Sequence, residues 1–106
     1  MSRAIIIKAN KMEKSIEVKN ILTSKFEARG IRVFEEYEEN AELVVSIGGD
    51  GTFLTAIKEY RFKDIPLIGI NTGHLGFLTE LTANDMDRLV NDYLEGTYST
   101  HFLDKN

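Results

Sequence analysis

The sequence of 106 residues contains no cysteine and only one proline. Without cysteine, the chain can form neither a disulfide nor a thiolate metal site. Three consecutive isoleucines near the N-terminus make an apolar run that is too short for a signal-peptide core or a membrane span. A net charge of −4 provides no basic footprint for nucleic acid or an anionic membrane. We therefore expect a cytoplasmic protein whose partners include no nucleic acid and no membrane.

Two common nucleotide-binding signatures are also absent. No glycine-rich loop ends in Gly-Lys-Ser or Gly-Lys-Thr, which excludes a P-loop NTPase. No Gly-x-Gly-x-x-Gly motif follows the first apolar run, which argues against a Rossmann-type dehydrogenase. The composition is 42% hydrophobic and 28% charged, as is usual for a globular chain, and the length suits one domain.

Short apolar runs alternate with helical patterns along the chain. This alternation predicts an α/β fold, with a mostly parallel sheet of about four strands and helices on both faces. Gly30 is expected to end the first helix in a left-handed conformation, and Thr52 to cap the second. Thr82 and Asp85 resemble a capping box for the third helix. We expect strands at 3–9, 31–34, 43–47 and 67–70, and helices at 12–29, 52–60 and 82–95.

Each predicted helix has apolar residues at a spacing that places them on one face. The acidic segment 35–42, in contrast, is expected to be a solvated loop. The predicted apolar faces are Val18, Ile21, Leu22 and Phe26 in the first helix; Phe53, Leu54, Ile57 and Tyr60 in the second; and Met86, Leu89, Val90, Tyr93 and Leu94 in the third.

The most informative segment is residues 48–52, Gly-Gly-Asp-Gly-Thr, which we call the glycine loop. Its glycines lack Cβ atoms and permit positive φ, so a polyphosphate can approach the backbone closely. The helix that follows directs free N–H groups and a partial positive charge at the loop. Asp50 would repel phosphate, so its presence favours a chemical role: either accepting a proton from a hydroxyl or holding Mg²⁺. The alternative is a tight turn in which Asp50 serves only the backbone.

A second glycine segment, residues 71–77, follows the fourth predicted strand. Because the carboxyl ends of parallel strands share one edge of a sheet, both segments should border one crevice. His74 could donate to a phosphate or a ribose hydroxyl, and Phe77 could stack on a base. Each also has a plainer interpretation, as a local hydrogen-bonding histidine and a core phenylalanine.

The two segments together, Ser46 to Leu54 and Gly69 to Leu78, resemble the NAD kinase family. Diacylglycerol and sphingosine kinases and phosphofructokinases carry similar Gly-Gly-Asp-Gly loops, but the second segment is much more specific to NAD kinases. The resemblance implies phosphorylation of the adenosine-ribose 2′-hydroxyl of NAD to NADP, using ATP or polyphosphate with Mg²⁺. It implies that Asp50 is the catalytic proton acceptor, that Gly51 contacts the dinucleotide, and that His74 and Phe77 lie at the adenine pocket. Gly49 is a further substrate-binding candidate, because its backbone in the glycine loop can be approached closely.

Members of that family continue into a β-rich second domain, and the full-length enzyme is expected to be a homo-oligomer. We therefore expect residues 1–96 to form the α/β nucleotide-site domain, and residues 97–106 to begin a junction into a second domain missing from this sequence. A lipid kinase-like domain and a catalytically silent nucleotide-binding or assembly module are the alternatives.

Overall fold

The computed structural model describes residues 3–60, 63–72 and 81–95. Within these ranges, strands and helices alternate in the predicted order. The elements are β1 (Arg3–Ala9), α1 (Glu13–Glu27), β2 (Ile31–Phe34), β3 (Ala41–Gly48), α2 (Asp50–Tyr60), β4 (Leu67–Asn71), β5 (Leu81–Thr82), a 3-10 helix (Ala83–Asp85) and α3 (Met86–Glu95).

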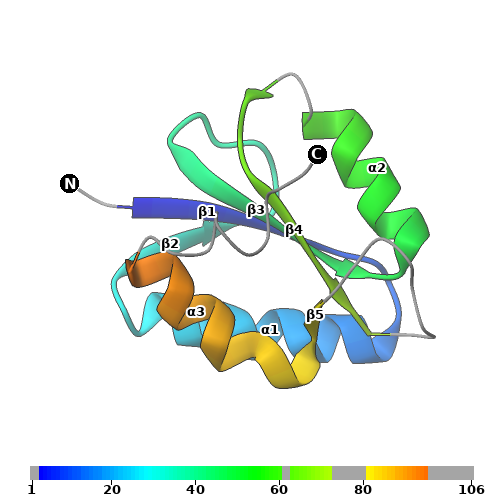
Figure 1. The fold of residues 1–106 in the computed structure, drawn as a ribbon, viewed down its shortest axis with the longest axis horizontal. Coiled ribbons are helices and arrows are strands. Elements are labelled where there is room, and N and C mark those ends of the chain that lie inside the picture. Colours follow the sequence, from blue (N-terminus) through cyan, green and yellow to red (C-terminus); the bar gives the residue numbers. More distant parts are fainter. Residues whose placement is uncertain (1–2, 61–62, 73–80, 96–106) are drawn as a thin grey trace.

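The strands form one parallel sheet in the order β2-β1-β3-β4-β5. The predicted parallel α/β fold is therefore confirmed, with β3 at its centre. The sequence did not predict β5, because a two-residue strand has no detectable periodicity. Since every strand runs the same way, β1, β3 and β4 all end at one edge of the sheet, which we call the carboxyl edge (Figure 1).

Helices cover both faces of the sheet, as predicted. Figure 1 shows α1 and α3 on one face and α2 on the other. Side chains alternate between the two faces along β3: Val45 packs in the cluster under α1 and α3, and Val44 packs in the cluster with Tyr60 of α2. No described helix has the length and apolarity needed to cross a membrane.

Several helix predictions are confirmed in detail and others are wrong. Gly30 has φ +80°, and the capping box of Thr82 and Asp85 is present. Ile21 and Leu54, both predicted to face the core, are 42% and 47% exposed. In α1 the buried face is rotated relative to the predicted apolar face, so that Ser15 is buried instead of Ile21. In α2 the small residue Ala56 packs against the sheet, which turns Leu54 outward.

Two boundary predictions are also wrong. Thr52 does not cap α2, because the helix begins at Asp50 and the Phe53 N–H already donates to the Gly49 carbonyl at 3.1 Å. The predicted acidic loop ends early, because Ala41 and Glu42 belong to β3.

A polar cluster ties α3 to the opposite edge of the sheet, where the strands begin. The Tyr93 hydroxyl donates to Glu42 Oε1 at 2.6 Å, and Arg3 Nε donates to the same oxygen at 3.1 Å. The hydrogen bond from Tyr93, followed by that from Arg3, lowers the pKa of Glu42. A carboxyl whose pKa falls on folding stabilises the fold above its unfolded pKa of about 4.3. That contribution is lost as the pH falls through the lower, folded-state pKa.

Candidate functional site

The two glycine-rich segments meet at the carboxyl edge of the sheet. Gly48 ends β3 and is in register with Asn71, which ends β4. The Thr72 N–H donates to the Gly48 carbonyl at 3.1 Å. The predicted adjacency is therefore confirmed as far as Thr72. His74 and Phe77 lie outside the described residues.

Gly48 is the position where the loop requires glycine. Its φ is +155°, a conformation that side chains disfavour. A Cβ placed there would lie 2.5 Å from Thr52 Oγ1, 2.7 Å from Asn10 Nδ2 and 2.9 Å from Thr52 Cβ. The absence of a side chain thus lets the end of β3 pass beneath the first turn of α2.

Gly49 and Gly51 have a different role from Gly48. Neither has positive φ, so of the three loop glycines only Gly48 uses the freedom that glycine permits. A Cβ at either position would have no heavy atom within 4 Å. The space above both backbones is therefore open in the described structure, and a ligand can approach them closely.

Asp50 is the first residue of α2 and is partly exposed. It lies beside both open glycines, at a helix end where a carboxylate interacts favourably with the helix dipole. That interaction is also what a purely structural aspartate would provide. Among the described residues, no group of three or more His, Cys, Asp or Glu side chains could hold a metal ion. A Mg²⁺ ion is usually held by one or two carboxylates together with substrate phosphates and water, and Asp50 could supply such a carboxylate.

A cavity of about 230 Å³ opens beside the first turns of α2. Thr52 and Thr55 of α2 line it together with Lys8 of β1. The Lys8 ammonium donates to the Glu35 carbonyl at 2.9 Å, and the Thr55 hydroxyl donates to the Gly51 carbonyl at 3.0 Å. Because Thr52 is the last residue of the glycine loop, the cavity lies directly beside that loop.

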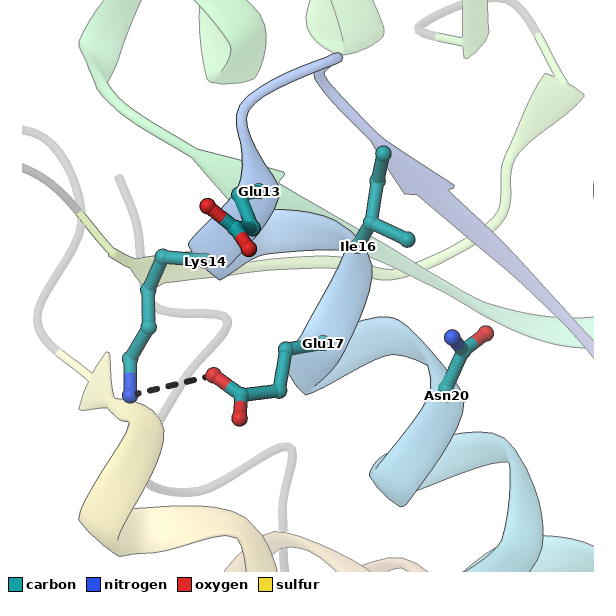
Figure 2. Close-up of a pocket in the computed structure, with 5 residues that line it drawn as sticks. All are labelled: Glu13, Lys14, Ile16, Glu17 and Asn20. Carbon is teal, nitrogen blue, oxygen red and sulfur yellow. Dashed lines mark ion pairs between the residues drawn. The ribbon is translucent and has the colours of Figure 1, made fainter.

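A larger hollow of about 520 Å³ lies along the outer face of α1. Figure 2 shows its charged lining, with Lys14 and Glu17 paired at 3.7 Å. None of the glycine-loop residues lines it. We therefore do not assign it to the site.

The sequence did not point to two polar residues that hold this edge together, Asn10 and Ser15. The Asn10 N–H donates to the Ile47 carbonyl at 3.0 Å, and Asn10 Oδ1 accepts from the Met12 N–H at 3.2 Å. Ser15 Oγ lies 2.6 Å from Thr72 Oγ1. Asn10 could have been found from its place directly after β1, at the same edge as the glycine loop. Ser15 could have been found as a polar residue on the apolar stripe of α1.

The chain is similar in sequence to known proteins. The family model described as ATP-NAD kinase N-terminal domain matches residues 2–98. The NAD kinase of Finegoldia magna is 40% identical over 97 residues, which cover 92% of this chain and 36% of that protein. The NAD kinase of Bacteroides fragilis is 39% identical over 75 residues, covering 71% and 26% respectively. That of Natranaerobius thermophilus is 48% identical over 61 residues, covering 58% and 21%.

The chain thus spans about a third or less of the length of these relatives. The match nevertheless includes both glycine-rich segments and nearly all of the described fold. This chain belongs to the NAD kinase family, over the N-terminal domain of that family.

Proposed function

We propose that the polypeptide carrying this chain phosphorylates the adenosine-ribose 2′-hydroxyl of NAD to give NADP. ATP or polyphosphate would be the donor, with Mg²⁺. The observation that carries this proposal is the position of Asp50. It provides a carboxylate between two glycines with open space above them, at the carboxyl edge of a chain that belongs to the NAD kinase family.

Asp50 is proposed as the proton acceptor. A ribose hydroxyl is a poor nucleophile at neutral pH, and a fixed carboxylate within hydrogen-bonding reach can take its proton as the new O–P bond forms. Phosphoryl transfer otherwise depends on holding donor and acceptor in line and on neutralising charge. Mg²⁺ bound to the donor phosphates would supply that neutralisation, and Asp50 is the loop carboxylate available to it.

The remaining contacts are proposed from the loop geometry and from the family. Gly49 and Gly51 would let the substrate approach the backbone, because no heavy atom of the described residues lies within 4 Å of a Cβ placed at either position. His74 and Phe77 are proposed as contacts to the adenosine half of NAD. We further propose a cytoplasmic protein that functions as a homo-oligomer.

The test replaces Asp50 with Asn in the full polypeptide that carries this chain. Asp50→Asn keeps the shape of the side chain and removes its ability to accept a proton. We expect NADP formation to fall by roughly 10²- to 10⁴-fold, with little change in melting temperature. Asp64→Asn is the matched control, because Asp64 is exposed and has φ +57°, a conformation that Asn tolerates well. Near wild-type turnover by Asp50→Asn would show that Asp50 is not the base.

A further inference from the structure

Ser15 occupies a position on α1 where an apolar side chain is expected. The buried residues of this helix are Ser15, Val18, Leu22 and Phe26, which follow one another at helical spacing. Ser15 is 0% exposed, as are Leu22 and Phe26. A hydroxyl buried this completely is costly unless it has a hydrogen-bond partner. The presence of serine here therefore calls for an explanation in terms of that partner.

The partner is Thr72, at the junction of the two glycine-rich segments. The oxygens Ser15 Oγ and Thr72 Oγ1 lie 2.6 Å apart, and either hydroxyl can be the donor. The Thr72 N–H in turn donates to the Gly48 carbonyl at 3.1 Å. One residue thus connects the start of α1 to the end of β3, across the carboxyl edge that Figure 1 shows.

We propose that Ser15 is a positioning residue of the phosphotransfer site, which acts through Thr72 to hold the end of β4 against Gly48. The proposal rests on the proposed function and adds a residue that neither the glycine loop nor the second segment contains. Ser15 sets where the chain leaves β4, immediately before Gly73 in the sequence. Its effect should appear in the binding of the dinucleotide, whose proposed contacts His74 and Phe77 follow Thr72.

Two substitutions remove this hydrogen bond from either side. Ser15→Ala deletes one hydroxyl, and Thr72→Val deletes the other while keeping the branched shape. A hydrogen bond contributes about 1 kcal/mol, or roughly fivefold in a binding constant. We expect each variant to raise the KM for NAD about fivefold and to leave kcat nearly unchanged. Ser24→Ala, at an exposed position of the same helix, is the matched control and should leave both constants unchanged.

The double variant separates a positioning role from two independent defects. If Ser15 acts through Thr72, combining the substitutions should raise KM no further than either does alone, because both remove the same bond. If the double variant raised KM by the product of the two single-variant factors, the proposal would be overturned. A lower melting temperature of Ser15→Ala with an unchanged KM would also overturn it, because that result is what a purely structural serine would give.

Amide hydrogen exchange gives a second readout that does not need turnover. In Ser15→Ala the Thr72 amide, which donates to Gly48, should exchange faster than in the wild type, and the Asn10 amide should not. Unchanged protection of Thr72 would contradict the proposal whether or not the protein is active. Absence of NADP formation by the wild type would instead refute the proposed function, and exchange at Thr72 would still decide the positioning role.

Discussion

Replacement of Gly48 with alanine should destabilise the domain strongly, although it adds a single methyl group. The new Cβ would lie 2.5 Å from Thr52 Oγ1 and 2.7 Å from Asn10 Nδ2. Rotation of the Thr52 side chain could relieve the first contact. It cannot move Thr52 Cβ, which would lie 2.9 Å away on the first turn of α2. The loop must therefore shift as a unit.

The magnitude follows from two contributions. Inserting a carbon into a packed site costs about 1–3 kcal/mol. Holding a non-glycine residue at positive φ costs about 1–3 kcal/mol more. The sum of roughly 2–6 kcal/mol is a large part of the 5–15 kcal/mol that stabilises a typical domain. For a chain of this length, 1 kcal/mol corresponds to about 4–8 °C in melting temperature.

Thermal unfolding followed by circular dichroism measures this directly. Gly48→Ala should lower the melting temperature by at least about 8 °C. Gly51→Ala is the matched control: Gly51 lies in α2 with no heavy atom near a new Cβ, so alanine should be neutral or stabilise by up to about 1 kcal/mol. The steric reasoning would be refuted if Gly48→Ala had the melting temperature of the wild type, or if Gly51→Ala had a melting temperature as low as that of Gly48→Ala.

Three further predictions follow from the site and the core. Gly49→Val and Gly51→Val should weaken nucleotide binding more than they lower the melting temperature, because each places a branched side chain in the open space of the loop. Unchanged nucleotide affinity, measured by calorimetry, would show that these glycines only shape the turn. Phe77→Ala should weaken binding of NAD by an amount typical of one lost aromatic contact, about 0.5–1.5 kcal/mol; unfolding without a specific binding defect would favour a core role. Tyr93→Phe should lower the free energy of unfolding by about 1 kcal/mol at neutral pH. The difference from wild type should shrink as the pH falls from the unfolded pKa of Glu42, about 4.3, through the lower pKa that this carboxyl has in the folded protein. A pH-independent difference in urea titrations would contradict this.

The sequence predicted the sheet well because its strands are short, apolar and bounded by clear signals. Residues 3–9 and 31–34 are strands with the predicted bounds, and Gly30 has the left-handed conformation expected of a helix end. The sheet order could not be read from periodicity, but alternation of strands and helices was enough to predict parallel strands. Parallel strands in turn brought the glycine loop and Thr72 together at one edge.

The failures arose where tertiary packing decides between equivalent local patterns. Ile21 and Ser15 both fit the stripe of α1, and only the sheet beneath it determines that Ser15 is buried and Ile21 exposed. The same holds within the glycine loop. All three glycines look alike in sequence, yet only Gly48 has positive φ and a crowded Cβ position, because Asn10 and Thr52 converge on it.

The central claim is that the polypeptide carrying this chain makes NADP. The most direct test incubates it with NAD, Mg²⁺ and either ATP or polyphosphate, and detects the product with a dehydrogenase that accepts only NADP. We expect NADP that carries its new phosphate on the adenosine-ribose 2′-oxygen, formed by the wild type and lost in Asp50→Asn. Binding of NAD without any NADP, under conditions where a known NAD kinase turns over, would contradict the proposed kinase activity and favour a silent nucleotide-binding module.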